Sequence, residues 1–199
     1  MMKPIIYVVD DDDIAIWTYT NMLCDIGADI RPFVSARRFL ATYRPGPCEC
    51  LICDLRMPEL DGLEVQRALI EAGNTLPIIF VSGRSEVASV VTAVKTGALD
   101  FLEKPVDGRR LGDAVRQALD RSRIAHKERL ESITREARLA LLTPKEREIV
   151  GHVIAGKSSR EISDLLGNSV RTIENHRARI TEKLHVTSTV ELVRLFVRH

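Results

Sequence analysis

Short runs of apolar residues alternate along the first part of the chain with longer segments in which apolar residues recur every three or four positions. Such runs suit buried strands, and the three-four spacing is typical of helices that bury one face. The runs predict five strands, at residues 5–9, 29–33, 51–54, 78–81 and 100–103. Because helical segments separate and follow these runs, the pattern indicates a doubly wound parallel sheet. Pro32 falls inside the second run, and proline is tolerated mainly at sheet edges, so that strand is expected at an edge.

The helical segments carry their own start and core signals. Asp12 or Asp13 is expected to cap the first helix, and Ser35 the second. The third and fourth helices are expected over residues 62–72 and 86–96. The apolar residues of these helices are Ile16, Tyr19, Leu23 and Ile26 at helical spacing in the first, Leu63, Val65, Leu69 and Ile70 in the third, Val87, Val90, Val91 and Val94 in the fourth, and Leu111, Val115 and Leu119, which should dock the fifth helix on the sheet.

Polar groups stand at the carboxyl ends of four predicted strands. Four acids, Asp10 to Asp13, follow the first strand, Asp54 ends the third, Ser82 follows the fourth and Lys104 follows the fifth. Parallel strands place these ends along one edge, where open α/β folds bind ligands, so the groups are expected to meet. Crowded carboxylates need a hard cation, and oxygen-only ligands suit Mg²⁺. A lysine and a hydroxyl beside such a cation suit a phosphoryl group.

Asp54 has two interpretations within its own segment. Met57-Pro58 favours an extended or turn backbone after it, and Asp61-Gly62 marks a turn before the next helix. Asp54 is therefore either a functional carboxylate at the sheet edge or an aspartate that only caps a turn or a helix. The polar groups at the other strand ends favour the functional carboxylate. Asp12 and Asp13 are expected to act as helix cap and solvated surface.

The segment from residue 113 to 143 contains neither glycine nor proline and is rich in strong helix formers. It predicts a helical linker that can continue the fifth helix. Leu130, Ile133, Ala137 and Ala140 repeat at three-four spacing along it. The stripe is suited to packing on a partner helix, but it is too short to indicate a coiled coil.

Capping signals divide the last sixty or so residues into four helices, over residues 144–154, 159–166, 170–184 and 188–198. Thr143, Ser158 and Ser188 each precede a glutamate by three residues, the pattern of a capping box. The second and third helices are joined by three residues, 167–169, a helix-turn-helix spacing. The spacing alone is also compatible with a generic four-helix bundle, the less favoured alternative.

Composition separates the two parts of the chain. The 199 residues are 45% apolar and 29% charged, with a net charge of +1. Residues 1–122 carry 14 basic and 18 acidic side chains, whereas residues 141–199 carry 10 and 7, which fits a metal site followed by a nucleic-acid module. The sequence lacks a signal-peptide pattern and a bilayer-length apolar stretch, so a cytoplasmic protein without membrane contact is expected. Cys50 and Cys53 should point to opposite faces of a strand, as buried reduced thiols and not as a metal pair.

The spacing of Asp10-Asp11, Asp54, Ser82 and Lys104-Pro105 resembles that of the receiver domains of two-component response regulators. The resemblance covers about residues 3–121 and implies a five-stranded parallel sheet of order 2-1-3-4-5. It implies that Asp54 is the phosphoacceptor. Mg²⁺ or Mn²⁺ would be bound by Asp11, Asp54 and the backbone carbonyl of Arg56, with Asp10 holding a metal-bound water.

The same resemblance assigns roles at the ends of the fourth and fifth strands. Lys104, with a cis bond to Pro105, and Ser82 would bind phosphoryl oxygens, and Ser82 and Phe101 would act as switch residues. Plain core packing is the alternative for Phe101. Phosphorylation would then change a surface around the fourth helix, fifth strand and fifth helix.

The tracts Leu142-Thr-Pro-Lys-Glu-Arg-Glu and Arg171-Thr-Ile-Glu-Asn-His-Arg resemble those of the NarL/FixJ, or LuxR-type, DNA-binding domain. At 100° per residue, Val170, Ile173, Ile180 and Leu184 should face the core of this domain. The opposite face should enter a major groove. The residues expected to contact DNA are Arg171, Thr172, Glu174, Asn175, Arg179 and Lys183. For each charged one, the alternative is a solvated side chain.

The expected organisation is a receiver domain at residues 1–121, a helical linker at 122–140 and a helix-turn-helix domain at 141–199. We therefore expect a phosphorylation-dependent transcriptional regulator, the response regulator of a two-component system. Its expected partners are a sensor histidine kinase, double-stranded promoter DNA and, after phosphorylation, a second copy of the chain.

Two other functional classes share features with this sequence. A haloacid-dehalogenase-type phosphatase also uses a strand-end aspartate with Mg²⁺, but it needs a second acid two residues on, where this chain has Arg56. The chain is therefore not expected to be an enzyme beyond its own phosphotransfer and dephosphorylation. An interaction protein without DNA binding is disfavoured by Arg171 and Asn175 on the predicted outward face.

Overall fold

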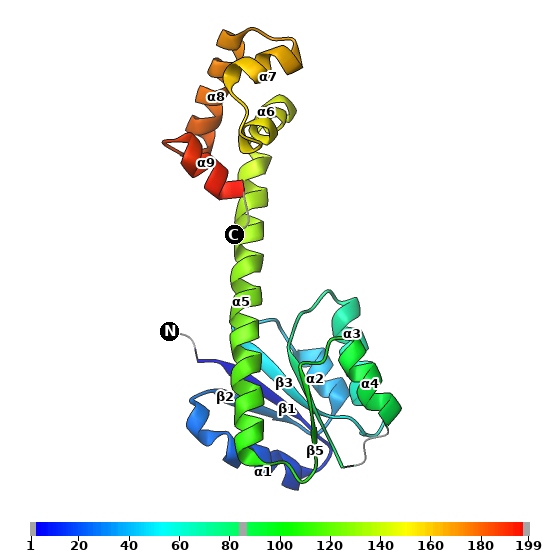
Figure 1. The fold of residues 1–199 in the computed structure, drawn as a ribbon. Helices are drawn as coiled ribbons and strands as arrows, with labels where there is room; N and C mark the ends of the chain where they lie inside the picture. Colours follow the sequence, from blue (N-terminus) through cyan, green and yellow to red (C-terminus); the bar gives the residue numbers. More distant parts are fainter. Residues whose placement is uncertain (1–2, 84–86, 197–199) are drawn as a thin grey trace. The chain divides into compact units, whose positions relative to one another are not determined.

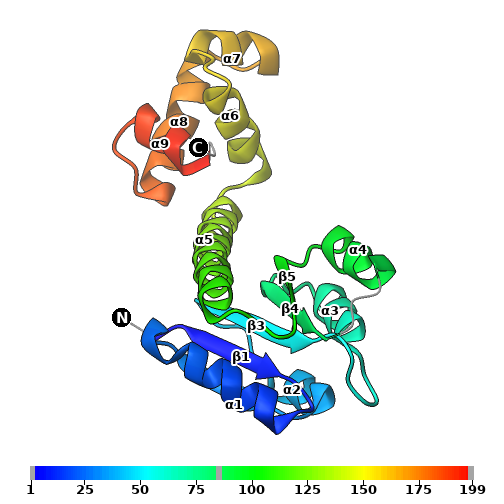
Figure 2. The same cartoon turned by 60° about the horizontal axis from the view of Figure 1, so that its bottom comes forward.

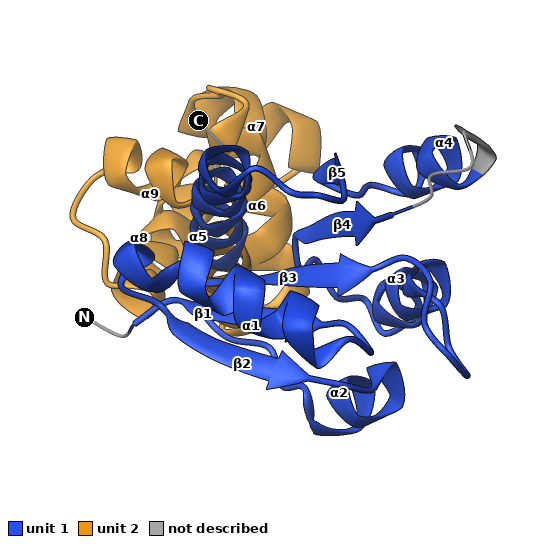
Figure 3. Ribbon diagram, turned by 90° about the horizontal axis from the view of Figure 1, so that it is seen from below, with its two compact units in different colours: residues 1–127 blue, residues 128–199 orange. Residues whose placement is uncertain are grey.

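The computed structural model describes residues 3–83 and 87–196, and the chain divides into two compact units, residues 1–127 and 128–199 (Figure 3). The first unit contains a parallel sheet of order β2-β1-β3-β4-β5, which confirms the expected topology. Pro32 lies on the edge strand, as its missing amide requires. The strands are β1 (Ile5–Val9), β2 (Asp29–Phe33), β3 (Glu49–Asp54), β4 (Ile78–Ser82) and β5 (Asp100–Glu103).

Helices cover both faces of this sheet (Figures 1 and 2). On one face, α1 and α5 pack on a core that includes Ile6, Ile52 and Leu111. On the other face, α2, α3 and α4 pack on a core that includes Phe39 and Phe80. Asp12 caps α1 and Ser35 caps α2, as expected. The helices are α1 (Asp13–Met22), α2 (Ala36–Thr42), α3 (Gly62–Glu71), α4 (Val87–Lys95) and α5 (Gly108–Ala140), with a short 3₁₀ turn at Cys24–Ile26.

The strand β3 is buried along its whole length, and its side chains alternate between the two cores. Cys50 packs in the core beneath α1 and α5, whereas Cys53 packs in the core beneath α2 and α3. The expected opposite orientation of these two thiols is thus confirmed. Burial, the largest influence, raises the pKa of the Cys53 thiol well above its usual value, so the thiol stays protonated and unreactive.

The helices bury narrower faces than the apolar pattern predicted. Val91 and Val94 of α4 are 44% and 55% exposed, and Ile70 at the end of α3 is half exposed, so these apolar residues lie outside the core. The small residue Ala93 of this helix is fully buried and belongs to the core. The predicted first residue of this helix, Glu86, lies outside the described residues.

The fifth helix continues without a break from Gly108 to Ala140, which confirms the expectation that the linker is helical. Leu111, Val115 and Leu119 are buried against the sheet, and Ser122 is the last buried residue of this helix. Beyond it, Leu130 and Ile133 of the predicted stripe are exposed. The division between the compact units falls inside the helix, between residues 127 and 128.

The described part of the second unit, residues 128–196, contains four helices after α5. Figures 1 and 3 show them. Its core includes Ile149, Ile162, Ile173 and Leu192, and each fully buried side chain of this size contributes about 1.5–3 kcal/mol. The helices are α6 (Pro144–Ile154), α7 (Ser159–Leu166), α8 (Val170–Leu184) and α9 (Thr189–Phe196). Residues 197 and 198, which the sequence placed in the last helix, lie outside the described residues.

Two of the three predicted capping boxes are complete. Thr143 and Ser158 each exchange hydrogen bonds with the glutamate three residues later. At the third, the Ser188 hydroxyl accepts the backbone N–H of Glu191, but the Glu191 carboxylate bonds to Thr187 instead of to the Ser188 backbone. The Glu191 carboxylate therefore accepts the backbone N–H of Thr187, one residue before the N–H that it would accept in a capping box.

Candidate functional site

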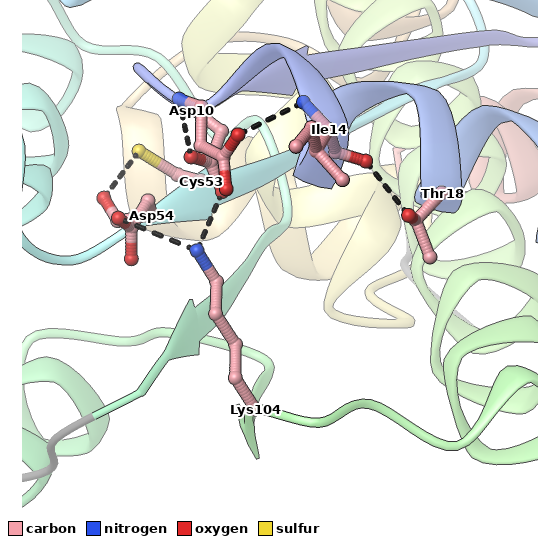
Figure 4. A network of polar contacts seen from close by, with 7 residues as sticks. Asp10, Ile14, Thr18, Cys53, Asp54 and Lys104 are labelled. Carbon is pink, nitrogen blue, oxygen red and sulfur yellow. Dashed lines mark hydrogen bonds and ion pairs between the residues drawn. The ribbon is translucent and has the colours of Figure 1, made fainter.

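The strand register brings the expected polar residues to one edge of the sheet (Figure 4). Val9 pairs with Cys53, and Asp54 pairs with Val81, so Asp10 and Asp54 leave the sheet at the same level. Asp10 and Asp54 are buried, and so is Ser82 at the end of β4. A buried carboxylate pair at a sheet edge requires compensating positive charge.

Part of that charge comes from Lys104, which follows β5. Its ammonium nitrogen lies 2.8 Å from Asp10 Oδ2 and 3.6 Å from Asp54 Oδ2 (Figure 4). The other oxygen of Asp10, Oδ1, accepts the backbone N–H of Asp12 at 3.0 Å. The Lys104–Pro105 peptide bond is cis, as expected from the resemblance to receiver domains. One lysine therefore serves two carboxylates that come from different strands.

The carboxylates also form a group that suits a cation. Asp10, Asp11 and Asp54 each offer an oxygen within 4.8 Å of the others, and Asp11 is exposed. Oxygen donors with a net negative charge, one of them reachable from solvent, fit a hard divalent cation such as Mg²⁺. The backbone N–H groups of Leu55 and Arg56 face the Asp54 carboxylate. The proposed part of the Arg56 carbonyl in binding a metal stays a prediction.

The electrostatics of the site follow from its burial. Burial raises the pKa of Asp54 most, with Asp10 adding to the rise, while Lys104 and the two backbone amides oppose it. Burial also disfavours the Lys104 ammonium, but its hydrogen bond and charge contact with Asp10, with Asp54 beyond, leave its pKa raised overall. Lys104 therefore remains a cation within the acidic cluster.

The loop after Asp54 depends on a glycine. A Cβ at Gly62 would lie 2.6 Å from the backbone oxygen of Asp54 and 2.8 Å from the Phe80 ring. Any larger residue would push α3 away from the end of β3. In the sequence, Asp61-Gly62 indicates only a turn, so this close approach is a role of Gly62 that the sequence did not predict.

Tyr19 is a further neighbour of the site that sequence analysis assigned to the core alone. It is buried on α1, and burial raises the pKa of its hydroxyl to about 12, with Lys104 as the largest opposing influence. Helical spacing predicts that a residue faces inward, but it does not tell where a hydroxyl at the end of the side chain lies. Phe101 packs at the margin of the core beneath α2 to α4, so packing is observed and a switch role stays a prediction.

In the second unit, α7 and α8 form the expected helix-turn-helix. Gly167 ends α7 in the left-handed conformation, and Ser169 caps α8 through the backbone N–H of Thr172. Ile173, Ile180 and Leu184 are buried. Val170 is 39% exposed, so its assignment to the core was wrong: it is the first residue of the helix, where its neighbours on that side are few.

The opposite face of α8 carries most of the residues expected to contact DNA. Arg171, Glu174, Asn175 and Arg179 are exposed there. Two other candidates have partners within the unit. The Thr172 hydroxyl lies 2.8 Å from the Ser169 hydroxyl, and Lys183 Nζ lies 2.7 Å from Oε2 of the buried Glu146. The contact of Lys183 gives it a structural role that the sequence did not indicate.

None of the helices within residues 3–83 and 87–196 is long and apolar enough to cross a membrane.

Known proteins resemble both units. Residues 6–116 match the family described as response regulator receiver domain, and residues 140–196 match bacterial regulatory proteins of the luxR family. The chain is 40% identical over 193 residues to the transcriptional regulatory protein TdiR of Thauera aromatica, a match that covers 97% of this chain and 85% of TdiR. It is 35% identical over 193 residues to the transcriptional regulatory protein FixJ of Bradyrhizobium diazoefficiens, covering 97% of this chain and 94% of FixJ.

Solved structures give the same picture. The response regulator StyR matches with a TM-score of 0.84 at 33% identity, over 98% of both chains. Full-length FixJ from B. japonicum matches with a TM-score of 0.59 at 35% identity, over 98% of this chain and 96% of that one.

Proposed function

The chain belongs to the transcriptional response regulators that join a receiver domain to a LuxR-type DNA-binding domain, and from this we propose that phosphorylation of Asp54 controls its binding to DNA. Relatives in this family are transcriptional regulators and not enzymes. The observation that carries the proposal is the cluster at the sheet edge of the buried Asp10 and Asp54 with the partly buried Lys104, with Asp11 beside it.

In the proposed reaction, a phosphohistidine of a sensor histidine kinase is the donor. The Asp54 carboxylate attacks phosphorus, the P–N bond breaks as the O–P bond forms, and the electron pair returns to the imidazole nitrogen. Lys104 supports this step because its ammonium already lies between Asp10 and Asp54 and can donate to a phosphoryl oxygen. Ser82, buried at the end of β4, would donate to another.

A divalent cation, Mg²⁺ or Mn²⁺, would be held by Asp11, Asp54 and the Arg56 carbonyl, with Asp10 holding a metal-bound water. When bound, it would offset charge on the phosphoryl oxygens. Asp10 has a second task in this arrangement, because its bond to Lys104 keeps the lysine directed at the cluster.

Contact with promoter DNA is proposed for the exposed face of α8. Arg171 and Arg179 can donate to phosphates or guanine, Asn175 suits adenine, and Glu174 can accept from cytosine. Thr172 and Lys183 complete the expected set at its margins, each shared with an internal partner.

Since a regulator of bacterial transcription acts where the DNA is, we place the protein in the cytoplasm. We keep 1–121, 122–140 and 141–199 as functional boundaries.

The test is labelling of an Asp54→Asn variant by acetyl phosphate or a phosphorylated kinase. The amide is nearly isosteric but is a much weaker nucleophile, so acid-labile labelling should fall to background. Asp13→Asn is the matched control, since Asp13 is an exposed acid of the same run, and it should be labelled like the unmodified protein. Undiminished labelling of Asp54→Asn would overturn the assignment.

A further inference from the structure

Arg177 is the one residue of α8 whose described hydrogen bonds reach two other helices at once. Its Nη1 donates to the Ser159 hydroxyl at 3.3 Å and its Nη2 to the Thr189 hydroxyl at 3.0 Å. Ser159 is the first residue of α7, and Thr189 is the first residue of α9. The side chain is half buried, unlike that of Arg179 on the exposed face. Both terminal nitrogens of its guanidinium are therefore engaged inside the unit.

The packing of the unit explains why such a connection matters. The helix α8 packs closely on α7 and α6, whereas α9 packs mainly on α6. The shared core is apolar, and apolar contacts are not directional. The planar guanidinium of Arg177, in contrast, fixes angles as well as distances.

The helices that Arg177 joins have different tasks on DNA. In a helix-turn-helix, the first helix crosses the phosphate backbone and the second lies in the major groove. Backbone contacts set the position of the protein, and base contacts read the sequence. Ser159 begins the first of these helices, and Arg177 belongs to the second. The hydrogen bond between Ser159 and Arg177 therefore joins α7, which positions the protein on the phosphate backbone, to α8, which reads the bases.

We propose that Arg177 is a positioning residue for sequence recognition: it orients α8 against the amino ends of α7 and α9 without contacting DNA itself. The proposal rests on the proposed reading of DNA by the exposed face of α8. The proposal gives different roles to two arginines of α8. Arg179 contacts DNA, and Arg177 orients the helix that carries Arg179.

The experiment uses the full-length protein with beryllofluoride and Mg²⁺. The probes are a duplex enriched from a random-sequence pool by the unmodified protein and a scrambled duplex of the same composition. Dissociation constants for both are measured over a salt series. Arg177→Met keeps the apolar stem and removes the donors, and Arg179→Met is the matched comparison. Arg121→Met, an exposed arginine of the first unit, controls for the loss of one charge.

For Arg177→Met, the ratio of scrambled to enriched dissociation constants should fall about tenfold, equivalent to about 1.4 kcal/mol, with the salt slope unchanged. Arg179→Met should weaken both duplexes and lower the slope by about 0.9, as the loss of one phosphate contact does. A lowered slope for Arg177→Met would show a phosphate contact and overturn the proposal. An unchanged ratio would also overturn it, because Arg177 would then serve the fold alone.

A second pair of variants tests the two hydrogen bonds without replacing Arg177, in case Arg177→Met does not fold. Thr189→Val and Ser159→Ala keep Arg177 and remove one acceptor each, so each should lose part of the ratio. If Arg177 acts through Thr189, the double variant Arg177→Met/Thr189→Val should lose no more than Arg177→Met alone. Full additivity, as expected for an independent base contact, would overturn the proposal. An unmodified protein that enriches no duplex would overturn the proposed function and this inference with it.

Discussion

Glu146 shows how one side chain combines two structural tasks. Its Oε2 accepts the backbone N–H of Thr143 at 2.8 Å, closing the capping box of α6, and it accepts Lys183 Nζ at 2.7 Å. The contact with Lys183, first, and then the Thr143 amide lower the pKa of Glu146 from 4.5 to about 2. The residue is buried, so its ionised form depends on these partners.

A pH dependence of the second unit follows. Because the folded-state pKa of Glu146 lies below its ordinary value of 4.5, the ionised side chain stabilises the unit above about pH 4.5, and this contribution is lost as the pH falls toward about 2. Glu146→Gln should cost about 1.5–3 kcal/mol at neutral pH, and the difference from the unmodified protein should shrink below pH 4.5.

Urea unfolding followed by far-UV circular dichroism measures this. The single tryptophan and all three tyrosines lie before residue 44, so intrinsic fluorescence reports the first unit separately. Glu148→Gln is the control, since Glu148 pairs with Lys145 on the surface and should change stability by less than about 1 kcal/mol. A penalty for Glu146→Gln that stays constant down to pH 2.5, a value about two units below the ordinary one, would contradict the assignment.

Trp17 offers an optical report on the cation site. It is 69% exposed on α1, one turn after the acidic run that contains Asp11. Mg²⁺ binding at the cluster should change the local field and give a saturable change in Trp17 fluorescence. Asp11→Ala should greatly weaken the titration. A saturable response that survives loss of both Asp11 and Asp54 would place the cation elsewhere, for instance at Asp12 and Asp13.

At the residue scale, the sequence predicted which groups reach the sheet edge better than what each group touches. That Asp10, Asp54 and Lys104 lie close together could be predicted, because each residue ends or directly follows a predicted strand and parallel strands end at the same edge of the sheet. The neighbours Tyr19 and Gly62 were missed as parts of the site. Their roles depend on the position of the Tyr19 hydroxyl and on how closely the chain at Gly62 approaches the end of β3. Both are decided by three-dimensional packing.

At the scale of elements, the two faces of α8 separate as helical geometry requires. Three of the four residues predicted to be inward are buried. Of the residues expected to contact DNA, Arg171, Glu174, Asn175 and Arg179 are exposed, whereas Thr172 and Lys183 are half buried. The differences lie at ends and margins: Val170 begins its helix, and Val91 and Val94 are exposed on a helix that buries Ala93. A run of valines marks a helix as apolar without telling how wide a face its neighbours cover.

The exposed face of α8 leads to a prediction about two of its side chains. Asn175→Ala should relax sequence preference, because a bidentate contact to a base is worth about 1–3 kcal/mol. Arg179→Ala should weaken all sequences more evenly, since an arginine toward the groove wall meets phosphates. Binding to enriched and scrambled duplexes across a salt series compares them. An unchanged ratio for Asn175→Ala would mean that Asn175 does not face the groove.

At the scale of the whole molecule, the alternation of strands and helices was sufficient to predict a parallel α/β sheet followed by a helical unit. The strand order came from resemblance, because many orders satisfy the same alternation. Helical propensity indicated a helical linker but left open whether it continues α5, and the structure has one helix from Gly108 to Ala140. Propensity alone does not tell where one compact unit ends, since the same helix serves both.

Phosphorylation should change the assembly of the molecule. Each chain carries one short recognition helix, and a single module of this size rarely reaches specific affinity alone. Beryllofluoride with Mg²⁺ should therefore raise the dimer population, with the exposed Val91 and Val94 of α4 available to be covered. Sedimentation velocity measures it, with Asp54→Asn as the unresponsive control. A protein that stays monomeric while it binds DNA fully would disprove this.

The contact between α5 and β3 determines where the chain can be cut. Ser122 Oγ accepts the backbone N–H of Glu49 at 2.9 Å, and the neighbouring Cys48 thiol donates to the Leu119 carbonyl at 3.6 Å. A fragment that stops at residue 121, the expected receiver boundary, would leave the Glu49 amide without its acceptor in a buried strand, at a cost of about 1–3 kcal/mol. A receiver fragment that extends a helical turn past Ser122 keeps that acceptor, so dissection of the protein should begin there.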